Sequence, residues 1–234
     1  MKIGIFDSGI GGFTVMDEIV KTMPGKHEYI YFGDNANNPY GEKTPGQLRR
    51  FARRIVKFLL EHKVDIIVVA CNTMVAVAMA TMKDVSTVPV IGVIAPTVAH
   101  LATRKRTTRV AIAATTATTK NGLYRKSLAE HGITTVNIAC PLFEPLIEAG
   151  QKGQTLDEAI DHHLKPLVGT NIDALVLGCT HYPIIQDRIR AYLDANGMSH
   201  VELIDPAIHT AKYVKKRFKN APESDEQKFT ILFS

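Results

Sequence analysis

The chain alternates short apolar runs with longer segments that have helical periodicity. Residues 65–69 (DIIVV) and 173–177 (DALVL) each contain an aspartate followed only by apolar side chains, which is typical of parallel strands covered on both faces. Residues 46–63 instead place Leu48, Ala52 and Val56 on one stripe, as in an amphipathic helix that packs on a sheet. This alternation predicts an α/β fold.

The two apolar runs belong to an internal repeat with an offset of 108 residues. Asp65 and Asp173 open the runs, and Cys71 and Cys179 follow them at matching points. Because strand and helix keep one offset, we interpret the chain as two related halves. The helical stripes that match at this offset are Leu48, Phe51, Ala52, Val56 and Leu59 with Leu156, Ala159, Ile160, Leu164 and Leu167.

The first predicted strand and the turn after it extend the repeat. At the same offset, residues 2–12 (KIGIFDSGIGG) match residues 110–120 (VAIAATTATTK), which pairs Asp7 with Thr115. We therefore predict an α/β protein of two pseudo-symmetric lobes, each a mostly parallel sheet flanked by helices. The predicted lobes are residues 1–95 together with 206–234, and residues 96–205.

Both cysteines of the repeat follow buried strands, at the edge of the sheet where ligands bind. In open parallel sheets the ligand lies beyond the carboxyl ends of the strands. The pseudo-twofold symmetry would place the two thiols opposite each other across a cleft between the lobes. We therefore expect the active site in this cleft. Four residues occupy the matched strand ends: Ser8, Cys71, Thr115 and Cys179.

Two thiols that face one carbon suit a reaction that is nearly symmetric. A thiolate can remove a proton from one face of the carbon while a thiol returns a proton to the other face, and the two groups exchange roles when the direction reverses. That reaction is a racemisation. Cys71 and Cys179 are the predicted acid/base pair, and Cys140, outside the repeat, is predicted to be structural.

Each thiol needs a neighbour that controls its proton, because a free thiol has a pKa of about 8.5. Asp7 ends a strand next to that of Cys71, and His181 is two residues beyond Cys179. Both cysteines also precede predicted helix starts, where the helix dipole favours a thiolate. Two further candidates end other loops on the same side: Asp34 and Glu148.

The residues favour a mechanism without a cofactor or a metal. Pyridoxal enzymes activate an amino acid through a Schiff base on a lysine, but no lysine stands at the matched strand ends. The three cysteines form no CxxC pair, so they indicate neither a zinc site nor a disulfide framework. Backbone amides and hydroxyls would instead stabilise the carbanion-like transition state.

Composition narrows the class of protein. The net charge is +5, which is compatible with a nucleic-acid partner, but much of the basic excess lies in residues 46–63, off the apolar stripe. We interpret it as a solvated helix face and expect no nucleic-acid partner. No apolar run approaches the ~20 residues that span a bilayer. We therefore expect no membrane association and a cytoplasmic protein, where thiols stay reduced.

Four ordered motifs spread over nearly the whole chain carry a family resemblance. They are DSGIGG (residues 7–12), GDNANNPYG (33–41), ACNT (70–73) and GCTHYP (178–183). Together they resemble glutamate racemase, of the cofactor-independent aspartate/glutamate racemase superfamily. The resemblance implies interconversion of L- and D-glutamate, which supplies D-glutamate for peptidoglycan.

The resemblance also implies roles for individual residues. Cys71 and Cys179 are the catalytic acid/bases, with Asp7 and His181 as assisting residues and Asp34 and Glu148 as additional ones. Short hydroxyls, amides and helix-start N–H groups suit a small zwitterionic anion. The residues implied to hold the substrate are Ser8, Tyr40, Gly41, Asn72, Thr73, Thr115, Thr118 and Thr180.

Three departures from the family pattern stand out. Residues 114–118 read ATTAT where relatives have glycines in a GTxGT turn, so the backbone is expected to lie differently against the substrate. The loop after Asp34 reads NANN where a threonine commonly follows the aspartate. The sequence ends at KFTILFS, where relatives usually continue, and we expect weaker packing of the first lobe.

Several alternatives stay open at the level of sequence. One is racemisation of another amino acid such as aspartate. Another is a hydrolase or acyl-transferase with a Cys/His pair, which explains one cysteine but not its counterpart. A third is an inactive, racemase-like binding or regulatory protein. We also expect a homodimer, which is common among two-lobed enzymes of this kind.

Overall fold

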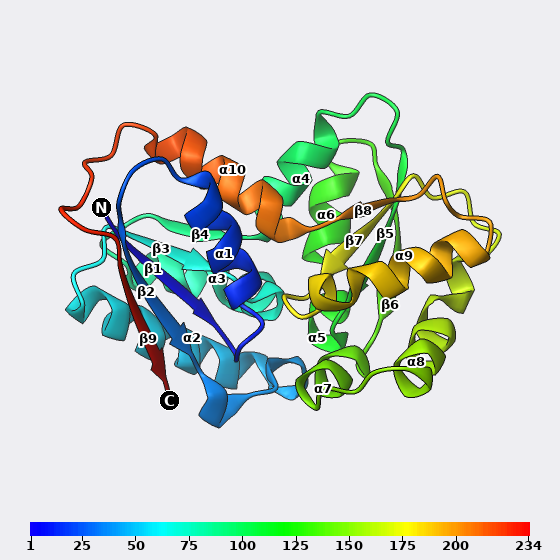
Figure 1. The fold of residues 1–234 in the computed structure, drawn as a ribbon, viewed down its shortest axis with the longest axis horizontal. Helices are drawn as coiled ribbons and strands as arrows, with labels where there is room; N and C mark the ends of the chain where they lie inside the picture. The colour runs from blue at the N-terminus through cyan, green and yellow to red at the C-terminus, as the bar shows by residue number, and fades with distance from the viewer.

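The computed structural model describes residues 1–234 as two α/β lobes that lie side by side (Figure 1). The first sheet contains, in spatial order, β4 (Val90–Gly92), β3 (Ile66–Val69), β1 (Lys2–Asp7), β2 (Glu28–Gly33) and β9 (Lys228–Phe233). The second contains β6 (Thr134–Ala139), β5 (Arg109–Ala114), β7 (Ala174–Gly178) and β8 (Glu202–Ile204). All strand pairs are parallel.

The two sheets have the same strand order. If β9 is set aside, β4-β3-β1-β2 in the first sheet corresponds to β8-β7-β5-β6 in the second. The predicted two-lobed, parallel α/β architecture is confirmed. β9 is an addition to the first lobe, and it pairs with the outer edge of β2.

Helices cover the sheets and connect the strands. In the first half of the chain they are α1 (Phe13–Thr22), α2 (Pro45–Glu61), α3 (Asn72–Val85) and α4 (Ile94–Ala102), with the short 3-10 turns η1 (Asn35–Asn37) and η2 (Tyr40–Glu42). The remainder are α5 (Thr116–Asn121), α6 (Leu123–Ala129), α7 (Phe143–Glu148), α8 (Gln154–Leu164), η3 (Lys165–Leu167), η4 (Tyr182–Ile185), α9 (Gln186–Ala195) and α10 (Pro206–Phe218). No helix is long and apolar enough to cross a membrane.

The predicted amphipathic helix is α2. Thr44 caps its first turn in a capping box with Gln47, which satisfies backbone N–H groups that have no partner within the helix. Its apolar stripe is buried, and the basic residues off that stripe are exposed as predicted: Arg49, Arg50, Arg53, Arg54 and Lys57.

Strands β3 and β7 are buried along their whole length. In β5, alternate residues belong to different apolar clusters: Ile112 packs in the larger cluster with first-lobe residues, and Ala111 packs in the second-lobe cluster. Both faces of the central strands are therefore covered, which explains why their sequences are apolar without alternation.

The match of Asp7 with Thr115 is wrong by one residue. Ile3 pairs with Ile66 in the first sheet, whereas in the second sheet Val110 pairs with Ala174, the counterpart of Ile66. Strands buried on both faces do not encode their register by alternation, so similarity of apolar runs leaves a one-residue slip undetected. The true counterparts are Ser8 with Thr115 and Asp7 with Ala114.

The chain crosses between the lobes twice. After β4 it enters α4 and continues into β5, and after β8 it enters α10 and returns to β9. Helix α10 packs against both α1 and α4, above the junction of the lobes in Figure 1. The predicted boundaries at residues 95/96 and 205/206 lie in α4 and at the start of α10, and the division itself stays a prediction.

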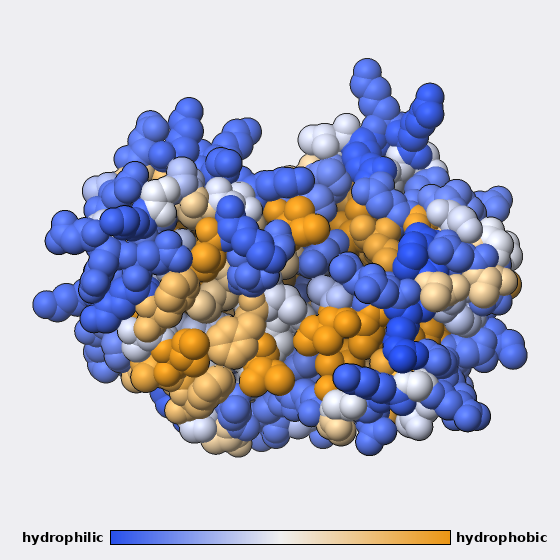
Figure 2. All heavy atoms as spheres, in the orientation of Figure 1, coloured by the Kyte–Doolittle hydropathy of each residue, from blue (hydrophilic) through white to orange (hydrophobic).

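The outer part of the first sheet has an exposed apolar surface. Phe229, Ile231 and Phe233 alternate along β9 and are each almost half exposed. Apolar side chains gather where β9 and its neighbours lie in Figure 1, on the lower left of Figure 2. On this face Phe229 stacks on Tyr29, and on the opposite face Leu232 packs against the larger apolar cluster.

Candidate active site

One small cavity between the lobes contains both cysteines of the repeat. Its empty volume is about 230 Å³. Residues from both lobes line it, and all but one were predicted from the sequence. The lining consists of Ser8, Tyr40, Gly41, Cys71, Asn72, Thr73, Thr115, Glu144, Cys179 and Thr180.

Cys71 lies at the end of β3 and is the N-cap residue of α3. Its thiol is buried, and this burial raises its pKa well above the ordinary value, as does the charge of Asp7. Backbone N–H groups of the first turn of α3, at Thr73 and Met74, oppose the effect by favouring the thiolate. The predicted helix start after Cys71 is confirmed.

Cys179 occupies the equivalent position after β7, but the chain continues differently. Two residues, Thr180 and His181, precede the 3-10 turn η4, and α9 starts only at Gln186. The prediction that an α-helix starts directly after Cys179 is therefore wrong. Pro183 stands near the start of η4. Burial raises the pKa of the Cys179 thiol, and nearby Glu144 raises it further.

His181 contacts the second thiol. Its Nδ1 lies 3.7 Å from Cys179 Sγ, and its Nε2 lies 3.0 Å from Glu148 Oε1. The Asn38 amide donates to both Glu148 oxygens at 3.0 Å. Burial lowers the pKa of His181, but the carboxylates of Glu148 and Asp7 outweigh it, so the pKa is raised overall. The structure thus brings His181 and Glu148 together as a pair beside Cys179.

Asp7 lies at the end of β1 and is fully buried. The Thr180 hydroxyl donates to its Oδ2 at 3.1 Å, while Oδ1 has no partner. Burial raises the pKa of Asp7, partly offset by His181. A buried carboxyl with a raised pKa next to a thiol is suited to exchange a proton with it.

Asp34 is not in the cavity lining. Its carboxylate accepts hydrogen bonds from the Tyr40 hydroxyl (2.6 Å) and the Asn37 amide (2.9 Å), and it pairs with Arg54 (3.0 Å). Its oxygens are therefore occupied within the first lobe. Asp34 fixes the Tyr40 ring, which does line the cavity.

Three threonines form a hydroxyl cluster across the lobe boundary. Thr73 Oγ1 lies 2.9 Å from Thr115 Oγ1 and 3.1 Å from Thr118 Oγ1. Thr115 caps α5, and its φ of −63° and ψ of 161° are open to any residue. The ATTAT segment therefore forms this turn without glycine. Thr118 supports Thr73 and Thr115 but is not itself in the cavity lining.

Close approach of the lobes requires a glycine at position 11. A Cβ atom there would lie 2.5 Å from Thr180 Oγ1 and 2.6 Å from the His181 ring. These two residues carry the contacts to Asp7 and Cys179, so Gly11 lets the β1–α1 turn press against them. A glycine in the DSGIGG motif is therefore required by close packing as well as by the turn.

Glu144 is the lining residue that sequence reasoning missed. It lies in α7, is 7% exposed, and has its pKa raised to about 7 by burial. Of the two glutamates in residues 141–150 (PLFEPLIEAG), only Glu148 is proposed from the sequence, and it is four residues farther along the same helix. The i, i+4 spacing to Glu148 places both carboxyls on one helix face and was the available signal.

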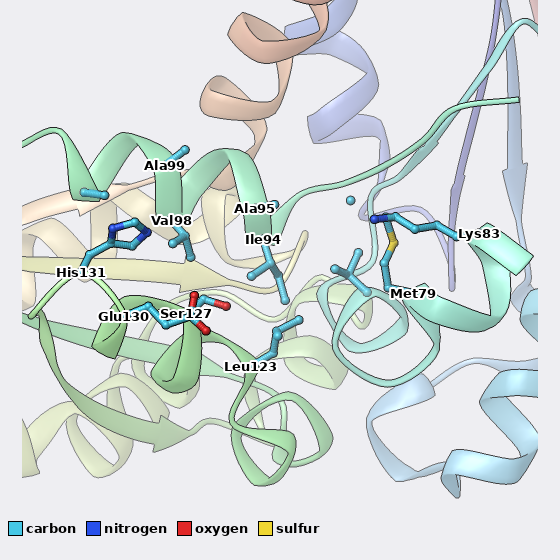
Figure 3. Close-up of a pocket in the computed structure, with 13 residues that line it drawn as sticks. Met79, Lys83, Ile94, Ala95, Val98, Ala99, Leu123, Ser127, Glu130 and His131 are labelled. Carbon is cyan, nitrogen blue, oxygen red and sulfur yellow. The ribbon is translucent and has the colours of Figure 1, made fainter.

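A larger cavity, with an empty volume of about 1000 Å³, lies elsewhere in the molecule. Figure 3 shows Met79 and Lys83 of α3, Ile94 and Val98 of α4, and Leu123 of α6 around it. Most of its lining is apolar, and it contains neither cysteine of the repeat. No group of three or more His, Cys, Asp or Glu residues that could hold a metal ion is present.

Comparisons with known proteins agree with the geometry of the cleft. The family model for Asp/Glu/hydantoin racemase matches residues 3–214. A glutamate racemase from Aquifex aeolicus is 39% identical over 221 residues, which cover 94% of this chain and 84% of that protein.

Solved structures show the same fold. Glutamate racemase from Francisella tularensis, determined with D-glutamate, is 33% identical, with a TM-score of 0.89 over 99% of this chain and 87% of that chain. Glutamate racemase from Campylobacter jejuni is 31% identical, with a TM-score of 0.89 over 100% and 92% of the two chains. The chain belongs to the Asp/Glu/hydantoin racemase family.

Proposed function

We propose that the protein is a glutamate racemase that interconverts L- and D-glutamate by proton transfer between Cα and two cysteines. The observation that carries the proposal is one cavity that holds the thiols of Cys71 and Cys179, each from the equivalent strand end of a different lobe. The relatives above, with that activity in their names, support glutamate as the substrate.

In the proposed mechanism, one cysteine removes the α-proton and the other protonates the opposite face. Burial keeps both thiols protonated in the empty cavity because it raises their pKa values. Each thiol must therefore lose its proton to a neighbour before it acts as a base. Asp7 serves Cys71, and His181, which is 3.7 Å from the sulfur, serves Cys179.

Small polar groups hold the substrate in this proposal. Thr73 and Thr115 present hydroxyls, and Asn72 presents its amide beside the first turn of α3. N–H groups at that helix start favour an anionic group, and they can also stabilise the charge that develops on the carboxylate when Cα is deprotonated. Ser8, Tyr40, Gly41 and Thr180 complete the predicted contacts from the remaining walls.

Hydrolysis or acyl transfer by a Cys/His pair is less well supported. The Cys179–His181 contact alone would fit such chemistry. Cys71, in the same cavity and at the equivalent strand end, has no role in it. Racemisation uses both thiols, and it is the function we retain.

Three wider predictions follow the proposed activity. The D-glutamate produced would supply peptidoglycan synthesis. A cytoplasmic location fits three free cysteines, since thiols persist in reducing compartments. The expected homodimer stays a prediction, and sedimentation of the purified protein at several concentrations tests it.

The direct test is incubation of the reduced protein with L-glutamate, and separately with D-glutamate, in deuterated water without an added cofactor. We expect α-deuterium incorporation and loss of optical activity from both enantiomers. Aspartate serves as the competing substrate in a parallel assay. A folded protein that produces neither exchange nor racemisation of glutamate would exclude the proposal, and faster racemisation of aspartate would reassign the substrate.

A further inference from the structure

Glu144 is an acidic side chain in a cavity whose lining contains no lysine or arginine. The residue is 7% exposed, and its carboxyl forms neither a hydrogen bond nor an ion pair. A buried carboxyl without a partner is costly in its charged form. Glu144 also lines a neighbouring hollow, together with Gly41 and Thr115.

The groups that face Glu144 come from several elements and are mostly acidic. Because the only nearby cation is the imidazole of His181, and it already pairs with Glu148, the surroundings favour the neutral carboxyl. Burial, with these acidic neighbours, raises the pKa of Glu144 to about 7. The neighbours are Asp7 after β1, Glu42 in η2, Glu148 on α7, His181 after β7, the thiols of Cys71 and Cys179, and the Tyr182 hydroxyl.

Glutamate brings two carboxylates and one ammonium group, a net charge of −1, into this space. The cavity lining already contains Glu144, the charge of buried Asp7 acts on it from nearby, and no basic side chain in the lining balances the charge of the substrate. Like charges within a few ångströms in a buried site repel strongly, and a proton is the usual means of relief. Glu144 is the group best placed to take the proton, because its carboxyl is buried in the cavity lining without a hydrogen bond or an ion pair, and burial raises its pKa to about 7.

We infer that the Glu144 side chain must be protonated for glutamate to bind in the cavity, so that substrate binding is coupled to proton uptake by this side chain. The inference rests on the proposed function, since it takes glutamate as the substrate. Neutral Glu144 can also donate a hydrogen bond to a substrate carboxylate, which the ionised form cannot do.

The coupling has a defined sign. Below pH 7 Glu144 is mostly neutral and the cavity is competent to bind. Above pH 7 the competent fraction falls, so the apparent dissociation constant for glutamate rises by about tenfold per pH unit. If the ionised carboxylate instead paired with the substrate ammonium group, affinity would increase with pH. The two arrangements therefore predict opposite slopes.

Calorimetric titration with racemic glutamate tests this on the intact protein. An equimolar mixture of enantiomers undergoes no net conversion, so the heat reports binding alone. Titrations at pH 7.5 in two buffers of different ionisation enthalpy give the number of protons taken up. We expect roughly 0.7 proton more per bound molecule in the wild type than in Glu144→Gln, because a carboxyl with a pKa of about 7 is mostly ionised at that pH.

Variants separate this role from a structural one. Glu144→Gln and Glu144→Leu are expected to bind glutamate about tenfold more tightly than the wild type at pH 8 and within about twofold of it at pH 6. Circular dichroism checks that both fold. Glu158→Gln, which removes an exposed charge on α8, a helix that contributes no residue to the cavity lining, is the matched control and is expected to keep the wild-type pH dependence.

The outcomes are distinct. A pH-independent affinity in the wild type, an affinity that increases with pH, or equal proton uptake in wild type and Glu144→Gln would overturn the inference while the racemase proposal survives. Absence of both glutamate binding and racemisation between pH 6 and 9 would overturn the proposed function, and the inference with it. Proton uptake that Glu144→Gln removes and Glu158→Gln retains supports the inference.

Discussion

Cys71 and Cys179 follow equivalent strands, β3 and β7, but the chain turns differently after each one. Cys71 caps α3 directly, so backbone N–H groups of a full helix point toward its sulfur. Cys179 is followed by a 3-10 turn, and it contacts the His181 ring instead. The comparison teaches that equivalent positions within a repeated fold can hold the same reactive atom under different proton control.

The residues that assist the two cysteines also differ between the lobes. Asp7 ends β1 in the first lobe, and its counterpart in the second lobe is Ala114. The second lobe therefore has no carboxyl at that strand end, and the His181–Glu148 pair takes its place beside Cys179. Thr180 joins the two arrangements, since its hydroxyl donates to Asp7.

Removal of either thiol should have the largest effect on activity. Cys71→Ala and Cys179→Ala should each lower racemisation by on the order of 10⁴-fold, because either loss removes one of the two proton-transfer groups. Deuterium exchange at Cα sharpens the test, since a single remaining base can exchange the proton of one enantiomer without inversion. We expect each variant to exchange a different enantiomer. Wild-type racemisation by either variant would contradict the two-base mechanism.

Substitution of the helpers should expose the asymmetry. Asp7→Asn and His181→Asn are expected to lower kcat by about 10²- to 10³-fold, as for other acid/base groups. The two enantiomers have equal free energy, so kcat/KM must stay equal in both directions. The asymmetry must therefore emerge in the α-deuterium isotope effects, which should increase for opposite enantiomers in the two variants. Identical isotope effects in both would mean that the helpers are not assigned to separate thiols.

Loss of Glu148 should disturb only the Cys179 side. Glu148→Gln removes the carboxylate that raises the pKa of His181, so the imidazole should lose its proton at lower pH. The limb of the pH–rate profile that reports His181 should therefore move to lower pH. We expect kcat to fall on the order of tenfold, less than for a group that itself moves a proton. Titration of the imidazole by NMR measures the shift directly. Asn38→Ala, which removes a donor to Glu148, should move the limb less.

The smallest expected effect concerns the contact that supports the Cys71 side from the second lobe. Tyr124 in α6 donates to Asn72 Oδ1 at 2.8 Å, and both residues are buried. Tyr124→Phe should reduce the free energy of unfolding by about 1 kcal/mol, the usual net value of one hydrogen bond, as measured by urea denaturation. Tyr213→Phe, on an exposed ring, is the control, with an expected change below about 0.5 kcal/mol. Equal changes in the free energy of unfolding for Tyr124→Phe and Tyr213→Phe would show that the Tyr124–Asn72 hydrogen bond does not stabilise the protein.

Local patterns were enough for the architecture and for most of the cavity. Apolar runs without alternation predicted strands covered on both faces, and the stripe of residues 46–63 predicted α2. The repeat placed Ser8, Cys71, Thr115 and Cys179 at strand ends, and all four line one cavity. These features were readable because secondary structure and the direction of parallel strands are set by short segments of chain.

Other features were decided by contacts between distant segments. Asp34 was grouped with the catalytic candidates, yet it bonds to Tyr40, Asn37 and Arg54 outside the cavity lining. Glu144 was passed over, yet it lines the cavity that contains both thiols. Loop composition gives no direction for a side chain, so the sequence could not tell which of these carboxyls faces the cavity.

By itself the sequence determined that the chain forms two similar α/β lobes and that a cysteine follows a buried strand in each lobe. Buried strands and amphipathic helices are encoded by local periodicity. Only the tertiary structure decided the one-residue register between the lobes, the late start of α9 after Cys179, and the burial of Glu144 without a basic partner. The register is set by strand pairing within each sheet, and the space and the charge around Glu144 are set by residues far apart in the chain.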